Sequence, residues 1–271
     1  MKLFYILLSS IISISSFGQI DYNVEYWFKY SLDTLSTASY SKPQTYLLYS
    51  EGKISRFQSL PGYLLDSITN NYIGEYDPKK ITSEILNKIV STKLPDRLGL
   101  FSVYKDFKSN DLYTIYDNGP GGAYQCKSPL TLTWQFYNEK KKINGVETLK
   151  ASTLIGGREW TVWYAPSIPI TDGPFKFFGT PGLIVRAYDK DELFFFELAA
   201  INNSPRKLFL KNYHFRKFNG LVCDYNKMIK GVHDLQKNPR VFGLTSEKDK
   251  IEVINNLKKE YKTRMDFYIE R

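Results

Sequence analysis

The sequence is poor in the residue types that most often carry catalysis or bind metals. It has two cysteines and two histidines in 271 residues. Neither His214 nor His233 lies in an H-E-x-x-H motif, and the chain has no G-x-S-x-G, Walker or C-x-x-C pattern. A zinc site built from these histidines with Cys126 and Cys223 is disfavoured, because their spacings match no familiar finger or ribbon. We therefore predict no metal, no cofactor and no catalytic residue.

Long apolar runs are missing after the N-terminus, which argues against a later membrane-spanning helix. The chain does begin with an apolar stretch, residues 3–14, behind Lys2 and ahead of the small residues Ser16 and Gly18. This order is typical of a secretory signal peptide over residues 1–18. The alternative is an anchor that is never removed. We expect an exported protein, periplasmic or extracellular, that does not span the membrane after cleavage.

Export would place the two cysteines in an oxidising compartment. Cys126 and Cys223 could then form a disulfide, which would close a loop of about 100 residues and be worth up to about 4–5 kcal/mol. The alternative is two separate thiols in the core, which is a common fate of cysteine.

Acidic residues are outnumbered, with 28 aspartates and glutamates against 37 lysines and arginines, a net charge of +9. Residues 204–220 interleave basic side chains with the rings of Tyr213, Phe215 and Phe218. Such a mixture can bind single-stranded nucleic acid. Because the chain has no nucleic-acid-binding motif, solvated loop faces around a few buried rings are the better interpretation. We predict no nucleic-acid partner.

Aromatic residues are abundant, at 16% of the chain, and they suit half-buried strands. Apolar and polar residues alternate over residues 22–31, as in a strand with one buried face. Residues 45–49 and 53–58 flank Glu51-Gly52 and predict a hairpin. Further strand patterns are dense, over about residues 130–138, 146–155, 158–165, 182–188 and 193–201.

Two segments change to helical spacing, residues 78–91 behind Asp77 and residues 245–265 behind a Thr or Ser cap. Many short strands with few helices predict an α+β fold. We expect a mainly antiparallel, curved, half-barrel-like sheet with two or three helices. No linker or repeat interrupts the pattern, so residues 19–271 are predicted to form a single domain.

The segment from Lys142 to Asp189 is the most informative. In the strand predicted at residues 158–165, the two tryptophans lie on opposite faces. The four prolines that follow predict a rigid, irregular loop. Such a loop at one end of a curved sheet could line a ligand cleft. The alternative is a loop that plugs the core with its aromatic rings. On the first interpretation the ligand-binding residues are Arg158, Trp160, Trp163, Tyr164, Lys176 and Phe177.

Other residues of this segment are predicted to shape the backbone. Pro181-Gly182 fits the central positions of a type II turn, and Gly179 suits a backbone angle that bulkier residues resist. The residues with this structural role are Gly157, Pro169, Gly173, Pro174, Gly179, Pro181 and Gly182.

Twenty positions of this segment form a pattern that is specific because so many of them occur in order. They are Ile143, Gly145, Lys150, Ala151, Gly157, Arg158, Trp160, Trp163, Tyr164, Ile168, Pro169, Gly173, Pro174, Lys176, Phe177, Gly179, Pro181, Gly182, Leu183 and Ile184. With them the segment resembles the defining region of the GLPGLI family, also called the porph_ging family, of exported Bacteroidetes proteins. The resemblance implies an exported Bacteroidetes protein of a family without an assigned activity, so it transfers no catalytic residue.

Two positions depart from the family pattern. Thr180 replaces the first leucine of the name motif, and Thr148 stands where many relatives have cysteine. The second departure implies that any disulfide of those relatives is not formed in the same way here.

The sequence as a whole predicts a non-catalytic cell-envelope protein. Through its aromatic, proline-rich loop it would bind a hydrophobic, peptide or glycan ligand, or an envelope protein. The alternative is an extracytoplasmic hydrolase with a site assembled from distant residues, in which His214 or His233 would lie beside a serine, a cysteine or a carboxylate.

Overall fold

The computed structural model of the chain describes residues 21–33, 36–73, 101–117, 123–202, 206–207 and 221–222. Outside these residues lie the expected signal peptide, both expected helices, both histidines and Cys223, so the statements about them stay predictions. In the part that is described, no helix is long and apolar enough to cross a membrane.

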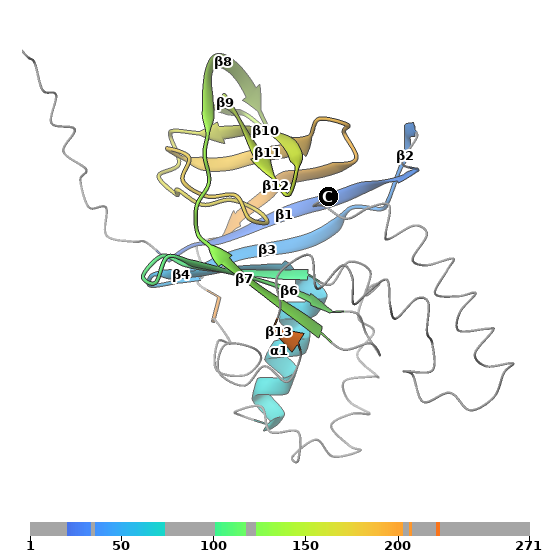
Figure 1. The fold of residues 1–271 in the computed structure, drawn as a ribbon, viewed down its shortest axis with the longest axis vertical. Coiled ribbons are helices and arrows are strands. Elements are labelled where there is room, and N and C mark those ends of the chain that lie inside the picture. The colour runs from blue at the N-terminus through green and yellow to red at the C-terminus, as the bar shows by residue number, and fades with distance from the viewer. Residues whose placement is uncertain are drawn as a thin grey trace, which may run out of the picture.

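The described strands form one sheet of 13 strands, in the order β13-β7-β6-β5-β4-β3-β1-β12-β11-β10-β9-β8, with β2 paired to β1 beside this path (Figure 1). The β13/β7 pair is parallel and the other pairs are antiparallel. The strands and the helix are β1 (Asn23–Asp33), β2 (Ser36–Tyr40), β3 (Gln44–Glu51), β4 (Ile54–Ser59), α1 (Leu60–Ile73), β5 (Phe101–Asp106), β6 (Asp111–Asp117), β7 (Ala123–Pro129), β8 (Gln135–Ile143), β9 (Val146–Ile155), β10 (Arg158–Ala165), β11 (Leu183–Asp189), β12 (Phe194–Asn202) and β13 (Leu221–Val222).

The mainly antiparallel sheet predicted from the sequence is confirmed. In β1 the side chains of Val24, Tyr26 and Phe28 are buried in the core, whereas Trp27 on the opposite face is 52% exposed. β3 and β4 form the predicted hairpin, closed by a turn in which Gly52 has a φ of +59°. The period-two pattern of β1 therefore identified both the strand and its buried face, and the Glu51-Gly52 turn identified the hairpin.

The helix α1 was not predicted. Ser59 caps it, because its Oγ accepts a hydrogen bond from the Gly62 N–H at 3.2 Å, and Pro61 occupies the first turn. Leu60-Pro61-Gly62 is also typical of a turn, which hides this start signal. It is the one helix in the described part of the chain, so the expected number of two or three helices stays a prediction.

A buried ion pair attaches α1 to the outer face of the sheet. Arg56 Nη1 on β4 lies 2.7 Å from Asp66 Oδ2 on the helix, and both side chains are buried. Burial raises the pKa of Asp66, and Arg56 opposes this effect. Beside the pair, the rings of Tyr63 and Tyr49 meet edge to face at 5.5 Å.

A short connection makes the sheet curve. β7 ends at Pro129 and β8 begins at Gln135, yet these strands stand second and twelfth in the sheet order. In a flat sheet they would lie about 48 Å apart, whereas the connecting residues span at most about 20 Å. The two wings of the sheet, β3–β7 and β8–β12, are therefore folded toward each other across β1 (Figure 1).

The core fills the concave side between the two wings. Phe28 stacks on Phe196 with a centroid distance of 4.7 Å. Phe175 comes from the loop between β10 and β11, residues 166–182, and meets Phe101 of the other wing edge to face at 5.4 Å. We call this segment the plug loop. Each aromatic pair contributes about 0.5–1.5 kcal/mol beyond its buried area, so the loop is part of the core.

Gly182 marks a close approach of the plug loop to the end of β10. Its φ is +148°, and a Cβ added there would lie 2.1 Å from the carbonyl oxygen of Ala165. Its N–H donates to Thr180 O at 2.8 Å, while the Leu183 N–H donates to Ile168 O at 3.0 Å. The predicted type II turn would instead join Leu183 to Thr180. The positive φ at Gly182 is confirmed, and the turn type is wrong.

Gly182→Ala is expected to lower the free energy of unfolding by about 3–4 kcal/mol, because the added Cβ meets backbone atoms that cannot move aside. Gly52→Ala is the matched control. Its φ is +59° and nothing lies within 4 Å of an added Cβ, so the loss should be only about 1–2 kcal/mol. Urea unfolding followed by tryptophan fluorescence measures both variants, and equal losses would contradict the close approach.

Candidate functional site

A buried ion pair fixes the plug loop to the sheet. Lys105 on β5 and Asp172 in the loop are both buried, and Lys105 Nζ lies 2.5 Å from Asp172 Oδ1. The same ammonium donates to the carbonyl oxygens of Gly173 at 2.7 Å and Phe177 at 2.8 Å. Three acceptors match the three N–H groups of a charged lysine. One side chain of β5 thus holds residues 172–177 in place.

The Asp172 carboxylate is also fully engaged. It accepts hydrogen bonds from the Tyr22 hydroxyl and, at 2.7 Å, from the Gly173 N–H. Burial, followed by the nearby carboxylate, raises the pKa of Tyr22 well above its usual value, so the hydroxyl stays protonated and donates. Burial lowers the pKa of Lys105, and Asp172 opposes this effect. The cluster is sealed from water, which makes it a structural anchor.

Arg158, one of the six predicted ligand-binding residues, forms another buried ion pair. Its Nη1 lies 2.5 Å from Asp189 Oδ2, and Asp189 Oδ1 accepts a hydrogen bond from the Phe194 N–H at 2.8 Å. The guanidinium also lies 5.1 Å from the centroid of the Phe194 ring. Arg158 therefore ties β10 to the turn between β11 and β12.

The other predicted ligand-binding residues lie mostly inside the molecule. Trp160 and Phe177 are fully buried, and their ring centroids lie 5.1 Å apart. Trp163 and Tyr164 are buried too, whereas Lys176 is half-buried. These positions favour the interpretation of the loop as a plug. Ligand binding by the six residues stays a prediction.

The residues predicted to shape the backbone lie in the β9–β10 turn and in the plug loop. Gly157 and Gly179 have φ values of +76° and +81°. Gly173 has no room for a side chain, because an added Cβ would lie 2.7 Å from Ile184 Cδ1. The plug loop also holds the three prolines named with them, Pro169, Pro174 and Pro181.

Hydrogen bonds accommodate the two departures from the family pattern. Thr180 is buried, and its hydroxyl donates to Gly182 O at 2.7 Å inside the turn. Thr148 is also buried, and it donates to Lys141 O on β8 at 2.6 Å. Both hydroxyls are thus satisfied within the sheet and loop. Cys126 on β7 is buried, and its pairing with Cys223 stays a prediction.

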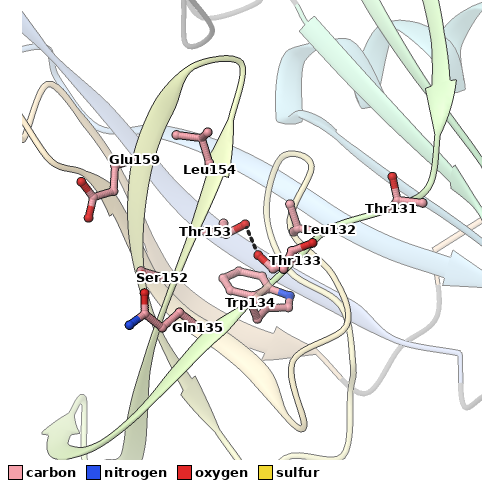
Figure 2. Close-up of a pocket in the computed structure, with 9 residues that line it drawn as sticks. All are labelled: Thr131, Leu132, Thr133, Trp134, Gln135, Ser152, Thr153, Leu154 and Glu159. Carbon is pink, nitrogen blue, oxygen red and sulfur yellow. Dashed lines mark hydrogen bonds between the residues drawn. The ribbon is translucent and has the colours of Figure 1, made fainter.

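An open groove lies beside the plug loop at the edge of the sheet (Figure 2). Residues 131–134 lead into β8 without forming a strand, although the sequence analysis predicted a strand from residue 130. Beyond the Gln135/Ser152 pair they diverge from β9, and the gap has a volume of about 620 Å³. The groove is lined by Thr131, Leu132, Thr133, Trp134, Gln135, Ser152, Thr153, Leu154 and Glu159.

Two hydrogen bonds fix the outer wall of the groove. Thr153 Oγ1 on β9 donates to Thr133 O across the gap at 2.7 Å (Figure 2). Trp134 Nε1 donates to Phe178 O in the plug loop at 2.8 Å. The plug loop therefore positions the groove although its own rings do not line it.

The lining combines apolar and uncharged polar side chains with one acidic residue. Leu154 is 66% exposed, and Leu132 faces the gap from the opposite wall. Glu159 is the one titratable residue of the lining, and it forms an exposed ion pair with Lys190 at 3.3 Å. Among the described residues, no cluster of three or more His, Cys, Asp or Glu could hold a metal ion. The arrangement suits recognition by shape and hydrogen bonding.

The groove was not predicted from the sequence. Its residues lie in three separate segments, and each of them falls within a predicted strand. The groove exists because residues 131–134 leave the sheet, and alternation of side chains is the same in a paired and an unpaired extended segment.

Residues 123–186 match the family model Porph_ging, described as "Protein of unknown function (Porph_ging)". This match confirms the family resemblance found in the sequence. It spans β7 to the middle of β11 and contains the whole plug loop and every residue that lines the groove. No curated protein sequence matches the chain.

Two solved structures of PNGF-II match the chain, and the first of them shows a similarity in fold. "Structure of PNGF-II in P21 space group" has a TM-score of 0.50 at 12% identity, over 80% of this chain and 34% of that chain. "Structure of PNGF-II in C2 space group" has a TM-score of 0.48 at 12% identity, over 80% and 33%. The chain spans about a third of the length of these proteins.

Lys105→Met is expected to lower the free energy of unfolding by about 3–5 kcal/mol, because it leaves the Asp172 carboxylate buried without its cation. Lys127→Met is the matched control, since Lys127 forms an ion pair with Asp111 but is 51% exposed. Its removal should change stability little. Chemical unfolding measures both variants. A loss for Lys105→Met no larger than that for Lys127→Met would show that the loop is anchored by other contacts.

Proposed function

We propose that this protein is an exported, non-catalytic ligand-binding protein whose binding site is the groove. The observation that carries the proposal is an open, mixed apolar and polar groove held rigidly beside the plug loop. The matched family is described as one of unknown function, and the likeness to PNGF-II is one of fold. The proposal therefore rests on the groove itself.

The size and lining of the groove support binding of a small or narrow ligand. Its volume of about 620 Å³ falls within the range of about 300–1,000 Å³ typical of ligand sites. Leu132 and Leu154 offer apolar contact from opposite walls, and the indole of Trp134, which donates to the plug loop, adds to the lining. Hydroxyl and amide groups around them can orient a ligand.

The rigidity of the groove lowers the cost of binding. The anchored plug loop holds Trp134, and Thr153 holds Thr133, so little side-chain or loop freedom remains to be lost when a ligand enters. In this proposal the predicted residues Trp160 and Phe177 act from within the core. They support the loop that positions the wall, and they do not touch the ligand.

The lining chemistry favours binding over hydrolysis. A serine or threonine nucleophile needs an adjacent general base. The one acid in the lining, Glu159, is exposed and forms an ion pair with Lys190, and among the described residues no histidine lies beside the hydroxyl groups of the lining.

Leu154→Asp is expected to abolish ligand binding, because it places a charge at the apolar wall beside Glu159. The measurement is NMR on isotope-labelled protein, to which mixtures of oligosaccharides and of short peptides are added. A mixture that contains a ligand should shift the indole N–H signal of Trp134 in the wild type. The signal should not shift in Leu154→Asp. The Trp27 indole on β1, separated from β9 by three strands, should stay unchanged.

Ile201→Asp is the matched control, since Ile201 is a 44% exposed residue of β12 outside the groove lining. It should leave the Trp134 response intact. The proposal fails if no mixture moves the Trp134 signal, or if Leu154→Asp responds as the wild type does. Turnover of any added substrate would instead favour the hydrolase.

A further inference from the structure

The groove exposes part of a strand edge. β9 pairs with β8 only as far as Ser152, opposite Gln135. The next residues, Thr153 to Ile155, pair with β10 on one side and lie beyond the last β8 partner on the other. Alternate main-chain N–H and C=O groups of these residues therefore face the gap, where a strand would normally lie.

Part of the neighbouring β8 edge is protected, and the edge in the groove is not. β8 carries Lys140, Lys141 and Lys142, and its pairing with β9 is irregular between Phe136 and Lys140. Charges and bulges of this kind prevent other chains from pairing with an edge strand. The β9 edge in the groove has neither a lysine nor a proline, and it presents the exposed Leu154.

Several polar side chains of the groove are already hydrogen-bonded within the protein. Thr153 Oγ1 is bonded to Thr133 O, Trp134 Nε1 to Phe178 O, and Ser152 Oγ to the Tyr137 hydroxyl at 3.1 Å. Recognition of a sugar depends largely on free side-chain donors and acceptors. The engaged side chains shift the balance toward a ligand that pairs with the main chain.

We propose that the groove binds an extended peptide, which adds a short strand to the free edge of β9 beyond Thr153, at Leu154 and Ile155. This inference rests on the proposed function and names the ligand class. Main-chain hydrogen bonds supply affinity in this mode of recognition, and pockets for alternate side chains supply specificity. The bond between Thr153 and Thr133 closes one end of the gap, so the peptide enters from the side of the β9–β10 turn.

The lining sets the chemistry of the peptide. The residue that comes to lie opposite Leu154 is apolar, because cross-strand neighbours on one face contact each other and Leu132 faces them from the other wall. Glu159 is the cross-strand partner of Leu154 on β10. An acidic residue at this point would be repelled, whereas an uncharged or basic residue would be accepted.

Selection from a displayed library of random linear peptides on the wild-type protein tests the inference. Enriched peptides are synthesised, and their affinity is measured by calorimetry before and after methylation of one backbone nitrogen at a time. Methylation at every second residue should weaken binding by about tenfold, the loss of one good hydrogen bond, while the residues between should tolerate it.

Two variants locate the peptide. Leu154→Asp should abolish binding of the enriched peptides, and Lys140→Glu on the protected β8 edge should leave it unchanged. Loss with Lys140→Glu but not with Leu154→Asp would overturn the inference, as would peptides that tolerate methylation at every position. If oligosaccharides shift the Trp134 signal while no peptide is enriched, the groove binds ligands but the peptide inference is wrong.

Discussion

The ion pair between Lys105 and Asp172 is the contact on which the open end of the molecule depends. Two charges buried away from water cost several kcal/mol each unless they are paired and their remaining polar atoms are bonded. Here the ammonium has three acceptors, and the carboxylate accepts from Tyr22 and Gly173. These bonds are satisfied together in one position of the plug loop. The loop in that position presents Phe178 O to Trp134, so a buried electrostatic requirement sets the wall of an exposed groove.

The curvature of the sheet determines where the groove forms. Because β7 and β8 stand near opposite ends of the sheet order, residues 131–134 must cross the open side of the molecule in an extended conformation. A segment on that path approaches β9 obliquely and reaches pairing distance only at Gln135. The strand edge left uncovered is thus a consequence of the connection that closes the two wings on each other.

Most of the strands could be predicted from the sequence because a strand with one buried face leaves a local signal of period two. The β1 pattern is an example, whereas the β3–β4 hairpin, buried on both faces, was recognised from its Glu51-Gly52 turn. The residue at which β8 begins could not be predicted, because residues 131–134 before it show the same alternation of side chains without pairing to another strand. The helix α1 was hidden because Ser59, Pro61 and Gly62 fit both a helix cap and a turn.

The residues of the plug loop and the groove also differ in how far the sequence could predict their roles. The sequence by itself determined the family resemblance, the rigid proline and glycine loop, and the aromatic residues that the core would need, because these depend on residue type and spacing. Only the tertiary structure decided that Trp160 and Phe177 face inward and that an open groove lies beside the loop. Burial is a property of neighbours brought together across the sheet. Lys105 pairs with Asp172, and Trp134 pairs with Phe178. The partners of each pair lie far apart in the chain, so no local sequence pattern predicts them.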